Sequence, residues 1–348
     1  MGTEYLTVSV GGMSYSAFLE AEVHAAFNAA ARDFSLEIAA ELGASATNAV
    51  FKVGAEVTIQ SNGDLLLTGF VDKKSPKIDA HRAVISVSGR SNSGDLVDSS
   101  AKHKTGRFEK KNPMQIGNEV SEGIGAKYTT DQQLEKIEQY QLNPGESTFR
   151  LVEKMARQQG LTVTGTADGN AKITKAGSKR HAGGLIEGRN MLTGQATHDG
   201  SNRHSEYTVR GQRPFGHGED ALEIEHVEKD SAVKRHRPLV LIQDEDTDKK
   251  RTKKRAKNRK NQAAGHALKA TITTQGFRDE GGQLWEPGNL VWVESPFLDI
   301  AQDMLIESVT YKQSGAGSIA SISLTDPRAY DGEGGKGNKS GGEWDIGG

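Results

Sequence analysis

The chain has 348 residues, enough for two or three domains that each bury a core, and its formal net charge of −2 gives nucleic acid no bulk electrostatic attraction. Only 6% of the residues are aromatic whereas 41 are glycine, a balance typical of short strands and turns. The lack of cysteine excludes disulfides and thiolate metal sites. No long apolar run and no basic, signal-like start is present, so we expect a soluble, unexported chain.

The first hundred residues alternate apolar and polar side chains, as half-buried strands do. The alternation predicts strands at 34–38, 56–59, 65–71 and 83–87. Between the second and third, Asn62-Gly63-Asp64 predicts a tight hairpin because Asn and Gly reach the positive φ that such turns need. We therefore expect residues 1–103 to form a small antiparallel sheet or barrel.

Residues 104–178 change to a helical pattern and predict a small α/β unit. A proline precedes one expected helix at 114–123, and Ser147 caps a second that runs to Gln159. Two short strands then flank Asp168-Gly169-Asn170, which favours a hairpin.

The third region repeats the strand order of the first. The segments pair as 34–40 with 205–211, 53–59 with 287–293, 65–74 with 303–312, and 83–90 with 320–327. The offset is 171 residues at Ile38 and Val209 but 234 at Gly54 and Gly288, so about 63 residues interrupt the second copy. Short alternating strands also resemble one another by chance, which leaves duplication a hypothesis on pattern alone.

The interruption divides the remainder of the chain. We expect the second copy at 179–211 and 267–330, an insertion with a charged helix at 212–266, and a Gly-rich flexible tail at 331–348. Within the insertion, 244–260 holds four acidic and nine basic residues. One interpretation is a solvated helix whose leading acids complement the helix dipole; the other is a nucleic-acid contact, although no aromatic residue interleaves with the bases.

Residue types that carry catalysis or bind metals occur without the spacing that such chemistry needs. The histidines show no HExxH pattern, and the glycines at 332–337 lack the Lys-Ser/Thr of a phosphate loop. Ser91 and Ser93 lie beside glycines without a nucleophile elbow. We therefore expect no catalytic, cofactor-binding or metal-binding residue, no cofactor, and no enzyme activity.

Residues 53–101 resemble the first barrel of the baseplate hub proteins of Mu-like contractile-tailed phages. The P2-type late-control D family and the N-terminal part of type VI secretion spike proteins are more distant relatives, and 144–163 resembles the helix and strand that follow the barrel. The match centres on Gly54, on the LTGFVD run with Gly69 and Asp72, and on SGRS followed by DLVDSSA, with Gly89, Arg90, Gly94, Asp95 and Asp98.

The resemblance implies a mainly β fold with α+β parts: two related antiparallel β-barrels, a small α/β domain between them and an insertion in the second. It implies a homotrimeric structural hub in the virion, at the tail baseplate, assembled in the host cytoplasm. Its expected partners are the six-fold tail tube protein, the central spike protein and other baseplate proteins, with transient passage of phage DNA and no membrane. A channel through which DNA slides should not hold it tightly, so 244–260 is expected on the outer side.

Two alternatives remain open at this point. A type VI secretion-like spike component is disfavoured because the sequence contains no long repetitive β-helix. A tail-associated cell-wall hydrolase lacks a candidate acid pair on a lysozyme-like segment.

In the resemblance, residues 88–101 close the first barrel and lead to the α/β unit. Gly89 and Gly94 are expected to permit a turn there. Arg90 is expected to pair locally, with Asp95 or Asp98, or with a neighbouring subunit, and Asp72 has the same alternatives.

Overall fold

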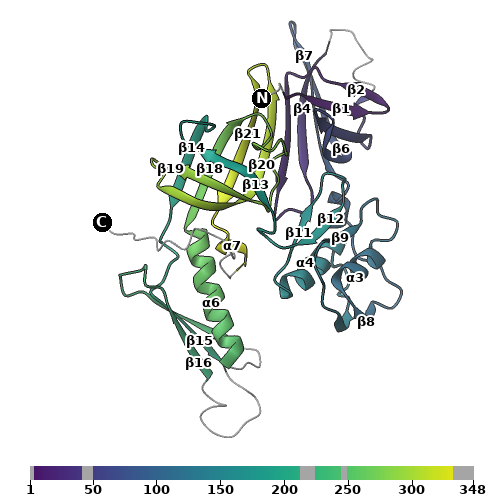
Figure 1. Ribbon diagram of the computed structural model, residues 1–348. Coiled ribbons are helices and arrows are strands. Elements are labelled where there is room, and N and C mark those ends of the chain that lie inside the picture. The colour runs from purple at the N-terminus through teal and green to yellow at the C-terminus, as the bar shows by residue number, and fades with distance from the viewer. Residues whose placement is uncertain (1–3, 41–49, 212–223, 244–248, 332–348) are drawn as a thin grey trace.

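The computed structural model describes residues 4–40, 50–211, 224–243 and 249–331 (Figure 1). Almost all of the expected Gly-rich tail lies outside these residues, as do the acids that precede the basic stretch. Within the described ranges, no helix is both long and apolar enough to cross a membrane. The expected fold class, mainly β with a small α/β unit between two related and largely antiparallel β-units, is confirmed. The closure of each β-unit into a barrel stays a prediction.

The first β-unit contains seven strands in the order β3-β4-β7-β6-β5-β1-β2. Their bounds are β1 (Leu6–Val10), β2 (Met13–Tyr15), β3 (Glu20–Ala26), β4 (Asp33–Ala40), β5 (Glu56–Ser61), β6 (Asp64–Ile78) and β7 (Ala83–Ser91). The alternation of apolar and polar residues places one face of most of these strands in the core, as in β1 and β3. The hairpin between β5 and β6 turns at Asn62 and Gly63, with φ of 48° and 92°.

The middle unit is the small α/β unit. It contains α2 (Gly94–Asp98), β8 (Arg107–Lys111), α3 (Pro113–Val120), β9 (Tyr128–Thr130), β10 (Ile137–Gln141), α4 (Thr148–Gln158), β11 (Thr162–Gly165) and β12 (Ala171–Thr174). Ser147 caps α4 as expected, since its hydroxyl accepts from the Arg150 N–H at 3.3 Å. The buried faces of both longer helices share a separate core with Phe108 and Tyr128.

The second β-unit contains six strands, with β14-β18-β21-β20 in sequence and β19 and β13 continuing from β20. Their bounds are β13 (Arg180–Ile186), β14 (Thr193–His198), β18 (Leu268–Gln275), β19 (Leu290–Ser295), β20 (Ile300–Ser314) and β21 (Gly317–Thr325), and α7 (Arg328–Asp331) follows. The order β18-β21-β20-β19 repeats β4-β7-β6-β5 of the first β-unit.

The insertion begins earlier than the sequence predicted. Residues 205–211 were expected to match 34–40 inside the second copy, and this is wrong. β15 (Glu206–Gly211) instead pairs with β16 (Ile224–Lys229) and β17 (Pro238–Gln243) in a sheet of its own, against which α6 (Lys249–His266) packs and which projects from the large sheet in Figure 1. β18 takes the place of β4. Both segments alternate, and only the tertiary pairing distinguishes them.

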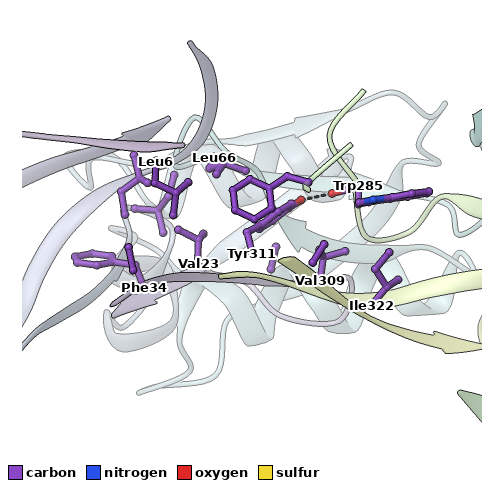
Figure 2. Packing of buried hydrophobic residues seen from close by; sticks show 14 of the residues in the cluster. Leu6, Val23, Phe34, Leu66, Trp285, Val309, Tyr311 and Ile322 are labelled. Atoms are coloured by element: carbon purple, nitrogen blue, oxygen red, sulfur yellow. Dashed lines mark hydrogen bonds between the residues drawn. The ribbon is translucent and has the colours of Figure 1, made fainter. Parts of the chain in front are cut away.

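A continuous sheet joins the two β-units, because the second half of β20 pairs with β3. Figure 2 shows the core at this junction, where Tyr311 of β20 belongs to the same buried cluster as Leu66 and its hydroxyl donates to the Trp285 carbonyl. Arg32, only 4% exposed, adds a polar link: it donates to the Leu66 carbonyl at 3.0 Å and pairs with Glu286 at 2.6 Å. Both β-units are thus fixed to each other by packing and by a charge pair between the buried Arg32 and the partly exposed Glu286.

Candidate functional site

The two β-units match at the level of single hydrogen bonds. The Gly54 N–H donates to the Val71 carbonyl and the Gly288 N–H to the Ile306 carbonyl, each at 2.8 Å. The two glycines have φ of 82° and 86°, a conformation that side chains with a Cβ rarely adopt. The expected match of Gly54 with Gly288 is therefore seen in backbone geometry.

A bulge recurs at the same point of the long strands. The register of β6 against β7 shifts between Val71 and Lys73, and that of β20 against β21 shifts between Ile306 and Ser308. Val71 therefore matches Ile306, an offset of 235 residues rather than the 238 implied by aligning 65–74 with 303–312. The alignment of 83–90 with 320–327 likewise differs by two residues from the pairing that the structure shows. Both differences arise because an alternating pattern does not by itself determine the register of a strand that contains a bulge.

One face of the joined sheet is buried, and the other is polar and rich in hydroxyl groups. Across the first β-unit, Ser35 lies opposite Ser88, and Ser86 opposite Ser75. Across the second, Thr271 lies opposite Ser323. Where the units meet, His24 Nδ1 and Thr310 Oγ1 are 3.0 Å apart on this same polar face. The polar face therefore continues across the junction.

Arg90, at the end of β7, connects the bulge of β6 to α2. Its Nε donates to Asp72 Oδ2 at 2.9 Å and its Nη2 to Asp98 Oδ2 at 2.7 Å. The hydrogen bond from Arg90 holds the pKa of the Asp98 carboxyl below its usual range, and the bonds to Asp98 and Asp72 raise the pKa of Arg90. Of the two local partners expected for Arg90, the structure shows Asp98. Asp95 instead accepts a hydrogen bond from the Ser99 N–H through its backbone carbonyl, at the end of α2.

The remaining glycines of the motif have different local roles. Gly69 and Gly89 lie where β6 and β7 cross closely: a Cβ on Gly69 would overlap the Arg90 carbonyl, and one on Gly89 would overlap the Phe70 carbonyl. Gly94, at the start of α2, has only ordinary contacts with Arg90. Gly69 and Gly89 are therefore needed because the backbones of β6 and β7 leave no room for a Cβ, whereas Gly94 is not needed for this reason.

Two buried polar pairs were missed by sequence reasoning. His181 and Asp279 are each 1% exposed in their side chains, with Nδ1 and Oδ2 2.9 Å apart, and His181 Nε2 accepts from the Glu286 N–H. Arg203 and Asp230 form a second pair at 2.8 Å in the insertion. Partners 98 and 27 residues apart leave no local signal in the sequence. Both ring nitrogens of His181 are occupied, so the pair fixes structure.

The basic stretch forms a helix with one packed side. Thr252, Ala256 and Ala263 of α6 are buried, and Lys260 pairs with Glu228 of β16 at 2.6 Å. The other basic side chains between 249 and 259 are exposed. Among the described residues, no three His, Asp or Glu side chains gather as metal ligands would.

Comparisons with known proteins match three successive parts of the chain. Residues 5–91 match the N-terminal domain of Mu phage baseplate assembly protein GpP-like, 93–175 the second domain of baseplate hub protein gp44-like, and 248–333 the fourth domain of Mu phage baseplate assembly protein GpP. Baseplate hub protein gp44 of Escherichia phage Mu is 26% identical over 271 residues, 74% of this chain and 71% of that protein.

Solved structures share the whole fold. The 43 kDa tail protein of prophage MuSo2 from Shewanella oneidensis has a TM-score of 0.83 at 27% identity, over 94% of this chain and 99% of that one. A tail protein from Neisseria meningitidis has a TM-score of 0.77 at 21% identity, over 95% and 99%. A type VI secretion component of E. coli shares the fold alone, with a TM-score of 0.55 at 10% identity over 91% and 76%.

Proposed function

We propose that the chain is a baseplate hub protein of the Mu-like phage kind, as its three matched segments and its 26% identity to the Mu hub protein support. We propose further that three copies form a ring that adapts the six-fold tail tube to the three-fold central spike. The chain is a structural baseplate protein of the phage tail, and the proposal assigns it no catalytic step. The expected domain division of the chain enters the proposal with one change, the earlier start of the insertion.

The observation that carries the proposal is the repeated strand order of the two β-units. Three chains with two matching units each offer six similar positions, which is what a six-fold neighbour requires, whereas the three chains themselves keep three-fold symmetry for the spike. The agreement between Gly54 and Gly288 supports similar surfaces at the level of backbone geometry.

We also propose that the polar face of the joined sheet lines a channel for DNA. Serine and threonine side chains recur at its matched positions, and Lys312 on the same face is paired with Glu20 at 2.8 Å, so its charges are mixed rather than uniformly positive. Phosphate binding strengthens with each neutralising cation, and a channel whose cations are offset by acids lets DNA pass. The exposed bases of α6 lie on the projecting insertion and are assigned to the outer side.

Light scattering of the full chain tests this function. We expect a mass three times the 37.4 kDa of one chain, either for the chain alone or after addition of the spike protein of the same phage. A monomer at every concentration, with and without the spike, would contradict the ring.

A further inference from the structure

We propose that β14 of one chain adds to the edge of β6 in the next copy, antiparallel and with Thr197 opposite Ser75. The inference rests on the proposed ring and specifies how its chains join. The partner is a second copy of this chain, and the contact continues the large sheet from one copy into the next.

The model for this contact lies inside the chain. The first half of β20 pairs with β19, and its second half, Ser308–Ser314, pairs with β3. The first half of β6 likewise pairs with β5, but its second half, from Lys73 to Ile78, has β7 on one side and no strand on the other among the described residues. β14 is also an edge, since within those residues it pairs with β18 alone.

β14 is the counterpart of β3. The Leu19 N–H donates to the Glu37 carbonyl as the chain enters β3, and the Leu192 N–H donates to the Thr273 carbonyl as it enters β14, each at 2.8 Å. The registers of β3 on β4 and of β14 on β18 agree with this match through the whole strand. The edge that pairs with β20 inside the chain therefore has an equivalent, β14, at the far end of the sheet, where the described residues place only one neighbouring strand, β18, beside it.

On both edge strands, the even-numbered residues direct their backbone N–H and C=O groups away from the sheet, so the two strands can pair. The Asp79 N–H donates to the Arg82 carbonyl at 2.9 Å, and the Asp199 N–H to the Ala267 carbonyl at 2.7 Å, so odd-numbered residues point into the sheet in both strands. Transferring the β20–β3 register places Pro76 opposite Ala196 and Ile78 opposite Gly194 as outward-facing pairs. Only Pro76 lacks a donor, and its carbonyl still accepts.

The apolar side chains along the two proposed edges are exposed, whereas their counterpart inside the chain is buried. Tyr311 is fully buried because the first β-unit covers it, whereas its counterpart Pro76 is exposed. Ile78 is 71% exposed on the core side of its strand, and Leu192, beside β14, is 56% exposed. Covering such apolar groups favours association, and an uncovered sheet edge readily accepts a further strand.

The contact joins unlike surfaces, β6 of one copy and β14 of another. Such a head-to-tail contact closes into a ring when the rotation between copies divides a full turn, and otherwise continues as a filament. The same register places Lys73 directly opposite Asp199, which adds an attractive charge pair at one end of the contact.

Cysteine cross-linking tests the register in a chain that has no cysteine of its own. Ser75 and Thr197 would form a non-hydrogen-bonded pair, whose Cα separation of about 4.5 Å suits a disulfide. We expect the full-length Ser75→Cys/Thr197→Cys variant, mildly oxidised, to give covalent species that end at three chains on a non-reducing gel and revert with reductant.

Two matched variants serve as controls. His24→Cys/Thr310→Cys places the same pair inside one chain, where the side chains are already in contact, and should close an intrachain disulfide. Ser75→Cys/Thr193→Cys moves one partner four residues, roughly 13 Å, along β14 and should give no cross-link.

The outcomes separate the contact from the ring. A trimer by light scattering that shows no Ser75–Thr197 cross-link, while the His24–Thr310 control closes, would overturn the edge pairing and leave the hub function intact. A monomer with and without the spike would overturn both. Covalent species longer than three chains would support the pairing and contradict the three-fold ring.

Discussion

The second halves of β6 and β20 are equivalent strands in unequal surroundings. β20 lies against β3 of the first β-unit and buries Tyr311, whereas β6 leaves Pro76 and Ile78 exposed. The two strands share their backbone geometry and have a bulge at the same place, yet the apolar side of β20 is covered and that of β6 is open. The difference indicates that the covered strand forms a contact inside the chain that the open strand repeats between chains.

The largest expected effect breaks the covered side of this comparison. Tyr311→Ala removes a fully buried ring and its hydrogen bond to Trp285, so we expect the free energy of unfolding to fall by about 3–5 kcal/mol. Pro76→Ala at the matching position of β6 should change it by less than about 0.5 kcal/mol, because the side chain is exposed. Denaturant unfolding of both variants measures the contrast; equal losses would contradict the assignment of the two strands.

A second prediction concerns a position where the units differ in packing. Gly89 matches Leu324 of the second unit, yet a Cβ at Gly89 would overlap the Phe70 carbonyl and crowd the Phe34 ring. Gly89→Ala should therefore cost about 1–3 kcal/mol of stability. Gly94→Ala is the control, since its added methyl meets only ordinary contacts, and thermal unfolding should leave it close to the parent. A Gly89 variant as stable as the control would show that β6 and β7 are free to separate.

A smaller effect is expected at the bridge from β7 to α2. The carboxyl pKa of Asp98 lies below its usual range because of Arg90, so the folded state gains stability above the unfolded pKa of about 3.9 and loses it as pH falls through the folded value. Both side chains are about half exposed, which limits the gain to about 0.5 kcal/mol. Asp98→Asn should therefore be slightly less stable than the parent at pH 7 and equal to it near pH 2. A difference that grows on acidification would contradict the pairing.

The smallest expected effect lies in the insertion, which has no counterpart in the first unit. Replacing Lys253, Lys254, Arg255 and Lys257 with Gln removes exposed charges from α6 and should leave the mass in solution and the stability unchanged. Assembly with baseplate neighbours is the property it could alter. Duplex DNA binding by the parent at physiological salt, lost in this variant, would place the helix in the channel instead.

Local chemistry made some features predictable. The turn at Asn62-Gly63, the cap at Ser147 and the match of Gly54 with Gly288 each depend on a residue type that suits one backbone conformation. Register and partner choice were less accessible. Residues 205–211 alternate as convincingly as β18 does, and nothing in their composition distinguishes a strand of the insertion from one of the second β-unit.

The candidate site was predictable where its residues are close in sequence and unpredictable where only the folded topology brings them together. Asp98 lies eight residues from Arg90 and was recognised as a partner, whereas Asp72 reaches Arg90 only through the β6–β7 pairing. Arg32 and Glu286 are 254 residues apart, and His181 and Asp279 are 98 residues apart. Such pairs depend on the folded topology, which single-chain patterns do not record.

Electron cryo-microscopy of the purified ring tests the central claim most directly. We expect six sheet units around one channel, first and second β-units alternating, with β14 of each copy continuing into β6 of the next and the polar face turned inward. A ring in which the two β-units occupy unrelated positions, or in which these two edges lie apart, would contradict the equivalence from which the hub function is inferred.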